Sequence, residues 1–161
     1  MPDLLVKLYQ LPDRESSNLK DQMTRKIVFR RAMAYEKHQI VRWVREHFNE
    51  RWSSECDVAF SNRPISCHIA TENGAILGFA CYDSTSMGMF GPIGVIGSAR
   101  QQGIGSTLLL FSLHSMAALG YAYAIIGAAS SMRFYERVVG QSGVIKIADS
   151  TPGIYADRLK E

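Results

Sequence analysis

The chain has 161 residues, of which 47% are hydrophobic and 20% are charged, and its formal net charge is +3. This length suits one domain with one sizeable core, and the composition excludes a disordered chain. No apolar run is long and uncharged enough to span a bilayer, and the N-terminus lacks the basic-then-apolar layout of a signal peptide.

Positive charge is concentrated in residues 25–51, which hold eight Lys or Arg residues against three Glu residues. Such a segment can attract a phosphorylated cofactor, an acidic substrate or nucleic acid. It lacks the interleaved aromatic residues of a protein that binds single strands. We therefore interpret it as a solvated helix face and do not expect nucleic acid as a partner.

The three cysteines are Cys56, Cys67 and Cys81, and none belongs to a Cys-x-x-Cys pair. An odd number of cysteines without such a pair indicates reduced thiols in a cytoplasmic protein. It does not suggest disulfides or structural zinc. Cys81 falls in a predicted strand, where a small apolar core residue is the expected role. The sequence therefore predicts no metal.

Apolar periodicity predicts eleven elements, followed by a tail from Ser150 that stays unassigned. In chain order they are strands 4–9 and 27–31, helices 35–48 and 51–60, strands 65–71, 75–83 and 87–96, helix 104–119, strand 121–126, helix 131–139 and strand 144–147. The polar residues 13–23 are interpreted as a loop or a helical turn.

Connections between the strands predict the sheet. Asn73-Gly74 is a strong type I′ turn signal, so strands 65–71, 75–83 and 87–96 should be antiparallel neighbours. A helix joins strands 87–96 and 121–126, which should therefore be parallel. The expected fold class is α/β (α+β), with a mixed, mostly antiparallel central sheet and helices on both faces. We expect one domain, 1–161.

A glycine loop, Arg100-Gln101-Gln102-Gly103-Ile104-Gly105, lies between a predicted strand and a predicted helix. That arrangement presents unpaired backbone N–H groups to an anion, and glycine lets a phosphate approach closely. A Walker loop is excluded because no lysine follows Gly105. A dinucleotide fingerprint is excluded because Leu108 stands where its third glycine would be.

The pattern Arg100-x-x-Gly103-x-Gly105 resembles the acyl-CoA diphosphate loop of the GNAT (Gcn5-related) N-acetyltransferase superfamily. A second family signature, Phe-Tyr-x-x-x-Gly, stands at 134–140, about thirty residues further on. The element order is also similar to the family's, and the resemblance covers about 25–147, with strand 4–9 as an N-terminal addition. Some positions depart from the family pattern: Gly97 for a common proline, Gln101 and Gln102 for Gly and Lys, and Ala128 for an Asn that contacts the pantetheine arm.

The resemblance implies transfer of an acetyl group from acetyl-CoA to a primary amine by direct attack in a ternary complex. Strand 87–96 should then splay from strand 121–126, so that the pantetheine amides can pair with its edge. The alternative is a non-catalytic acyl-CoA-binding or interaction module on the same fold. The residues expected to bind the cofactor are Ile93, Gly94, Val95, Arg100, Gln101, Gln102, Gly103, Ile104, Gly105, Ser106, Ser131 and Phe134.

Tyr135, in the second signature, is the predicted general acid, because a phenol can give a proton to the departing thiolate. Glu55, Asp83 and His68 are candidates for the base that deprotonates the amine. The resemblance also implies that the early helices and the strand ends build the acceptor pocket, so we expect Trp52 and Tyr82 to line it.

The expected partner is a small-molecule or peptide amine, whose identity the sequence does not give. A membrane is not expected, and the expected location is the cytoplasm. A homodimer stays open. Nucleic-acid binding through residues 25–51 is the third alternative for function, and salt-dependent retention on DNA or RNA would support it.

Overall fold

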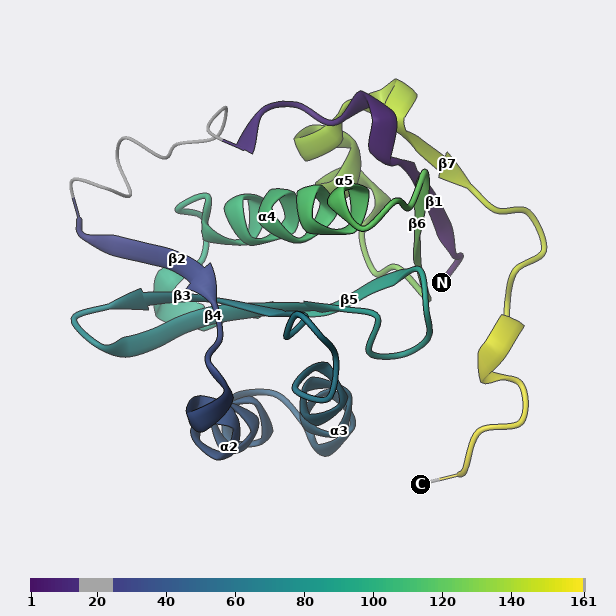
Figure 1. Cartoon of the computed structure of the whole chain (residues 1–161). Coiled ribbons are helices and arrows are strands. Elements are labelled where there is room, and N and C mark those ends of the chain that lie inside the picture. Colours follow the sequence, from purple (N-terminus) through teal and green to yellow (C-terminus); the bar gives the residue numbers. More distant parts are fainter. Residues whose placement is uncertain (15–24, 161) are drawn as a thin grey trace.

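The computed structural model describes residues 1–14 and 25–160, so most of the polar segment 13–23 lies outside the described residues. In the described part, seven strands form one mixed sheet in the order β2-β3-β4-β5-β6-β1-β7 (Figure 1). The strands are β1 (Leu4–Lys7), β2 (Ile27–Arg31), β3 (Cys67–Glu72), β4 (Ala75–Tyr82), β5 (Met89–Val95), β6 (Tyr123–Ile126) and β7 (Val144–Lys146).

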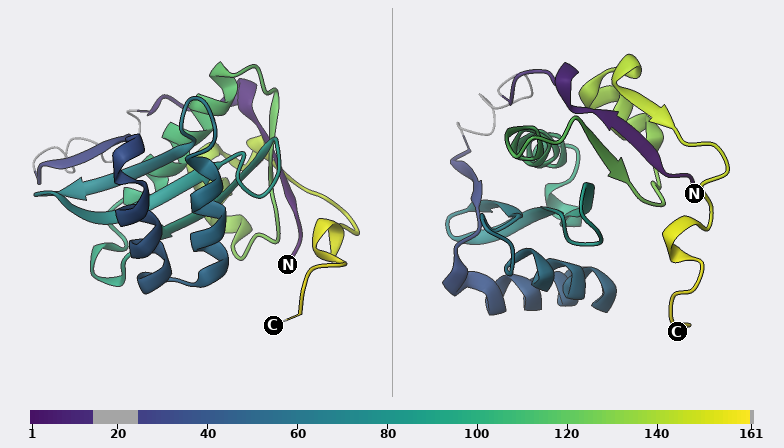
Figure 2. Two further views of the ribbon diagram at one scale, coloured as in Figure 1. Left: turned by 60° about the horizontal axis from the view of Figure 1, so that its bottom comes forward. Right: turned by 45° about the vertical axis from the view of Figure 1, so that its right-hand side comes forward.

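Helices cover both faces of this sheet, as predicted (Figures 1 and 2). α2 (Lys37–His47) and α3 (Glu50–Ala59) lie on one face, and α4 (Ile104–Ala118) lies on the other. α5 (Met132–Val139) packs beside β7. Among the described residues, no helix has both the length and the apolar character needed to cross a membrane.

The hydrophobic core accordingly has two parts. One lies between the sheet and α4, with Leu108, Leu109 and Leu113 fully buried. The other lies between the sheet and the α2–α3 pair, around Ile40 and Phe79. α4 buries side chains around most of its circumference, which explains why its sequence is apolar on more than one side.

The strand directions follow the predicted connections. β3 and β4 form an antiparallel hairpin, and both turn residues, Asn73 and Gly74, have the positive φ that a type I′ turn needs. β4 and β5 are also antiparallel, whereas β5 and β6, joined through α4, are parallel. The predicted mixed sheet is therefore confirmed.

The N-terminal strand is an internal strand of the sheet. β1 lies between β6 and β7 and is antiparallel to both. Leu4 and Val6 are fully buried, while Leu5, on the other face of the strand, is partly exposed. Hydrophobic periodicity predicted the strand but could not predict its place, since strand order depends on long-range pairing.

Candidate active site

The first feature of the site is a gap in the pairing between β5 and β6. Their parallel ladder ends at Phe90 and Ile126, and the strands separate beyond it. On its other edge, β5 stays paired with β4 as far as Val95. The predicted splay is therefore present, and it leaves one edge of residues 91–95 without a strand partner.

The backbone groups at this open edge can be assigned from the alternation along a strand. Ile96 donates its N–H to the carbonyl of Leu77 on β4, so Ile96 faces β4. Because backbone groups alternate in direction, Gly94 also faces β4, and Ile93 and Val95 face the open edge. The expectation that Gly94 offers its backbone to a cofactor is thus not supported by the geometry.

Gly94 has a packing role instead. A Cβ atom at this position would lie 2.5 Å from Cζ of Phe48, which is closer than real contacts allow. Phe48 follows α2, and its ring packs at a tilt against those of Trp52 and Phe79. Glycine is therefore needed here so that the aromatic cluster under β5 can approach the strand.

The second feature is the uncapped N-terminus of α4. Gly103 is the N-cap residue in a left-handed conformation, with φ 76°, and no side chain caps the helix. Gln101 also has a positive φ, 64°. In the described part of the chain, no group accepts a hydrogen bond from the amides of Ile104, Gly105 or Ser106. These N–H groups can bind an anion.

The two long side chains of the loop act differently. The Nε of Arg100 donates to the carbonyl of Val95 at 3.1 Å, and the exposed side chain keeps its terminal nitrogens unbonded within the described residues. Gln102 instead turns back and donates to the carbonyl of Ser98. Arg100 can therefore add positive charge to an anion site, while Gln102 supports the loop itself.

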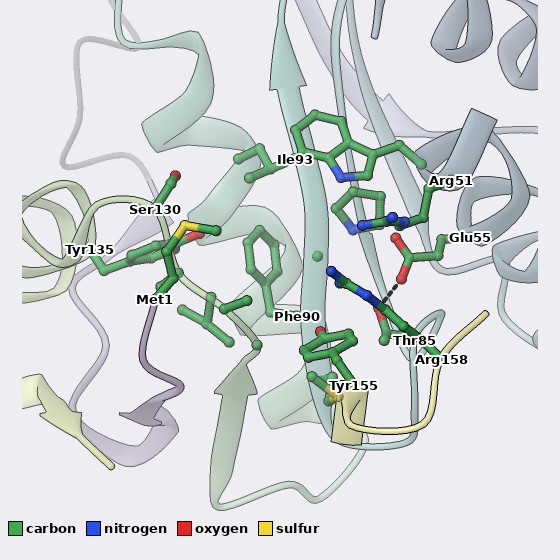
Figure 3. A pocket seen from close by; sticks show the side chains of 18 residues that line it. Met1, Arg51, Glu55, Thr85, Phe90, Ile93, Ser130, Tyr135, Tyr155 and Arg158 are labelled. Carbon is green, nitrogen blue, oxygen red and sulfur yellow. Dashed lines mark hydrogen bonds between the residues drawn. The ribbon is translucent and has the colours of Figure 1, made fainter. Parts of the chain in front are cut away.

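A cavity of about 310 Å³ opens at the gap between β5 and β6 (Figure 3). Its walls come from β5, from the loop after β6, from α3, from Tyr135 on α5 and from the C-terminal tail. The residues that line it are Met1, Arg51, Trp52, Glu55, Thr85, Met89, Phe90, Gly91, Pro92, Ile93, Ile126, Gly127, Ala128, Ala129, Ser130, Tyr135, Tyr155 and Arg158.

Tyr135 is one of these residues and is 8% exposed. Ser131 caps α5 by accepting a hydrogen bond from the N–H of Phe134, and the ring of Phe134 lies edge-on to that of Tyr135. No group among the described residues bonds the Tyr135 hydroxyl. Burial raises the pKa of Tyr135 to about 12, so the phenol keeps its proton at neutral pH.

Phe134 joins α5 to the glycine loop. A Cβ atom on Gly105 would lie 3.7 Å from the ring of Phe134, which is ordinary contact. Arg137 stacks its guanidinium over the outer side of the same ring. The two sequence signatures, far apart in the chain, therefore lie next to each other at the start of α4.

Glu55 and Trp52 reach the cavity from α3. Asn49 caps this helix by accepting a hydrogen bond from the N–H of Trp52. The hydroxyl of Thr85 donates to Glu55 Oε1 at 2.6 Å, which fixes the carboxylate. Tyr135 and Glu55 lie on opposite sides of the cavity (Figure 3). The structure therefore brings the predicted general acid, Tyr135, and one candidate for the general base, Glu55, to the same cavity.

Asp83, the second candidate base, is not at the cavity. Its carboxylate accepts hydrogen bonds from the N–H of Gly88 at 2.7 Å and from the hydroxyl of Tyr121 at 3.1 Å. Asp83 itself has a positive φ, 52°. These bonds hold the turn between β4 and β5, so the geometry gives Asp83 a role in that turn and not in proton transfer.

Tyr82 and His68 also lie elsewhere, on the α4 side of the sheet. The hydroxyl of Tyr82 accepts a hydrogen bond from Arg31 at 2.6 Å, and Tyr82 is 1% exposed. The His68 ring stacks on Tyr82, and burial, followed by the charges of Arg31 and Arg14, lowers the pKa of His68 to about 3. Successive residues of a strand face opposite sides, so Tyr82 packs in the core beneath α4 while Cys81 packs in the core beneath α2 and α3.

Several cavity residues escaped the sequence analysis. Tyr155 and Arg158 come from the tail, which carried no recognisable pattern, and Thr85 comes from a polar loop. Asp3 also matters, because its carboxylate accepts the N–H of Ala128 at 2.8 Å and so fixes the loop after β6. These contacts join distant parts of the chain, and no local sequence signal marks them.

Comparison with known proteins then gives the family. The family model described as the acetyltransferase (GNAT) family matches residues 37–141. The chain belongs to the GNAT acetyltransferase family. The match includes the glycine loop, the open edge of β5 and Tyr135. No curated protein matches the chain.

Solved structures with low sequence identity to this chain share its fold. A GCN5-related glucosamine N-acetyltransferase region of a fungal multi-domain GH3 β-N-acetylglucosaminidase has a TM-score of 0.69 and 17% identity, over 91% of this chain and 19% of that chain. A GCN5-related N-acetyltransferase from Sphaerobacter thermophilus has a TM-score of 0.67 and 20% identity, over 91% of this chain and 48% of that chain. A GNAT family acetyltransferase from Brucella melitensis in complex with acetyl-CoA has a TM-score of 0.55 and 17% identity, over 69% of this chain and 80% of that chain. The chain thus spans less than half the length of the first two proteins.

Proposed function

We propose that this chain is an N-acetyltransferase that moves an acetyl group from acetyl-CoA to a primary amine by direct attack in a ternary complex. The observation that carries the proposal is the open edge of β5, which runs between the uncapped start of α4 and the cavity with Tyr135. A thioester bound along this edge can have its diphosphate at the helix and its acyl group in the cavity.

The binding half of the proposal assigns three parts of acetyl-CoA to three groups. The diphosphate binds the amides of residues 103–106 and the terminal nitrogens of Arg100. The pantetheine amides pair with the outward backbone groups of Ile93 and with the N–H of Val95, whose carbonyl already accepts a hydrogen bond from Arg100 Nε. The structure from Brucella melitensis, described as a complex with acetyl-CoA, supports this cofactor for the fold.

The chemical half assigns the proton movements. The amine nitrogen attacks the thioester carbon, and an N–H at the open edge stabilises the oxyanion that forms. The C–S bond then breaks, and the departing thiolate takes the proton of Tyr135. Glu55 accepts the proton lost by the amine, directly or through water. Burial keeps the phenol of Tyr135 protonated at neutral pH, so a hydrogen is present for the thiolate when it forms.

The acceptor amine would enter between α3 and the tail. Trp52 offers an apolar wall, and Glu55 offers a carboxylate that attracts a protonated amine before it reacts. Tyr155 and Arg158 close the opposite wall. This arrangement fits a small-molecule or peptide amine and does not select one.

A non-catalytic acyl-CoA-binding module is the second candidate. Ala128 favours it, because Ala128 has no side-chain amide to hold the pantetheine arm and its N–H is already bonded to Asp3. The two candidates differ in turnover. With acetyl-CoA and a panel of polyamines, amino acids, aminoglycosides and peptides, an enzyme releases free thiol in an amine-dependent reaction. Tight acetyl-CoA binding without thiol release for any amine would favour the module.

A further inference from the structure

The three cysteines of the chain meet at one point in the core. Cys56 comes from α3, Cys67 from β3 and Cys81 from β4, and the chain has no other cysteine. Their sulfur atoms all lie within 4.8 Å of one another. All three residues are fully buried. A single buried cysteine is an ordinary small core residue, but all three cysteines of a chain in mutual contact form a cluster of soft ligand atoms.

The fold explains how the cluster forms. Cys67 and Cys81 are direct partners in the antiparallel pair of β3 and β4. The next pair along the ladder, Ser66 and Tyr82, is bonded through the N–H of Tyr82, so Cys67 and Cys81 form a pair without backbone hydrogen bonds. Side chains approach most closely at such pairs. Cys56 then reaches the same point from the helix that packs on β4.

The three thiols are close enough to bind one ion together. Their ligand atoms all lie within 4.8 Å of one another, and thiolate is the form of cysteine that binds a metal. A cation that enters the cluster therefore replaces thiol protons, which pass to solvent.

The number of sulfur ligands in the cluster limits which metal ions it can bind. No other His, Cys, Asp or Glu of the described residues belongs to the cluster. Structural zinc sites use four protein ligands in a tetrahedron, whereas thiolate sulfur also suits softer ions such as Cu(I). The surroundings are apolar, with Ile69 and Phe79 in the same part of the core. These features favour a three-coordinate sulfur site.

We propose that Cys56, Cys67 and Cys81 form a three-sulfur binding site for a thiophilic metal ion, separate from the acyl-transfer cavity. With Cu(I), three Cu–S bonds form and the protons still held by the thiols pass to solvent, without any change of oxidation state. The occupied site links α3 to β3 and β4. Because α3 also carries Trp52 and Glu55, the ion would hold these cavity residues in place.

The first experiment uses the unmodified chain. Under anaerobic, reducing conditions and with hours allowed for entry into the buried site, Cu(I) is titrated against a colorimetric Cu(I) chelator. We expect one Cu(I) per chain and a higher melting temperature, since a ligand of the folded state stabilises it. Zn(II) should bind at least about 10-fold more weakly, because it lacks a fourth ligand. Equal affinities would contradict the three-coordinate site.

Arsenite tests the convergence of the thiols directly. One As(OH)₃ reacts with three thiols to give three As–S bonds and three waters, so native mass spectrometry should show a gain of one arsenic and a loss of three hydrogens. An adduct that retains a hydroxyl on arsenic, or no adduct, would overturn the proposal. This measurement does not depend on the folding of any variant.

Variants then assign the ligands. Cys56→Ser, Cys67→Ser and Cys81→Ser should each lower the Cu(I) affinity by more than about 100-fold, beyond the loss typical of groups outside the ligand shell. Ser54→Ala, an exposed change on the same helix, is the matched control and should bind as the parent does. Circular dichroism checks that each variant is folded. A folded Cys→Ser variant that keeps stoichiometric, unweakened Cu(I) binding would refute the site.

Discussion

The Tyr135 hydroxyl faces the cavity and has no hydrogen-bond partner in the part of the chain that the structure describes, and its ring packs against Phe90 and Phe134. If it protonates the leaving thiolate, Tyr135→Phe should lower kcat by about 10²- to 10⁴-fold and leave the Kd for acetyl-CoA within about twofold. Steady-state thiol release and calorimetry measure the two quantities. Tyr123→Phe, an exposed tyrosine on β6, is the control and should react normally. Equal kcat values for Tyr135→Phe and the parent would remove Tyr135 from the mechanism.

His68 makes a prediction about acid stability. Its pKa falls from 6.5 to about 3 in the folded protein, chiefly because of burial. The unfolded chain therefore binds a proton between pH 6.5 and pH 3 that the folded chain does not, and the free energy of unfolding should fall as the pH is lowered through this range. The slope is at most about 1.4 kcal/mol per pH unit.

Urea unfolding at several pH values measures this slope. His68→Gln should flatten it, whereas His38→Gln, which changes an exposed histidine, should leave it as in the parent. An unchanged slope in a folded His68→Gln protein would show that other groups carry the acid sensitivity.

Some residues of the candidate site could be predicted from the sequence, and others could not. Arg100, Gly103 and Tyr135 were found from local motifs, because a motif fixes both residue type and position on its element. Tyr82 was expected at the acceptor pocket from the family resemblance, and Asp83 was one of three candidate bases. Their side chains instead bond Arg31 and the turn at Gly88, which are contacts that only the folded chain brings together.

Among the elements, the loop before α4 takes a positive φ at two positions, Gln101 and Gly103. Gly103 has φ 76°, whereas Gly105 has an ordinary φ and room for a Cβ atom. We expect Gly103→Ala to destabilise the fold by about 1–2 kcal/mol, because alanine is strained in this region, and to weaken acetyl-CoA binding. Gly105→Ala should leave the stability within about 1 kcal/mol of the parent.

Chemical denaturation and calorimetry compare these two variants. We expect the larger loss of acetyl-CoA affinity in Gly103→Ala, because this substitution changes the direction of the amides at the start of α4. A greater loss in Gly105→Ala would contradict the backbone assignment made for this loop.

Elements were predicted well because hydrophobic periodicity reports the local environment. The helices 35–48 and 104–119 and the hairpin at Asn73-Gly74 were all found at or near their observed bounds. The open edge between β5 and β6 was expected only through the family resemblance. The neighbours of β1 and the tail wall of the cavity follow from tertiary packing, which periodicity does not report.

In the whole molecule, β1 connects the N-terminal segment to two strands from the C-terminal part of the chain. It pairs with β6 on one edge and β7 on the other, and Asp3 fixes the loop beside the cavity. That residues 1–161 form one domain stays a prediction. Leu4→Ala should cost about 2–5 kcal/mol, as expected for a fully buried leucine, although it lies only four residues from the start of the sequence.

Leu5→Ala is the matched control for this prediction, since Leu5 lies on the partly exposed face of the same strand and should cost clearly less. Denaturant unfolding measures both. Similar small losses for the two variants would mean that β1 is peripheral to the stability of the sheet.

The central claim is that acetyl-CoA binds along the open edge of β5 with its diphosphate at the start of α4. Isothermal titration of the chain with acetyl-CoA tests it most directly. The account predicts saturable binding of one acetyl-CoA per chain, weakened by Gly103→Ala and unaffected by Tyr135→Phe. No heat of binding at millimolar acetyl-CoA would contradict the account.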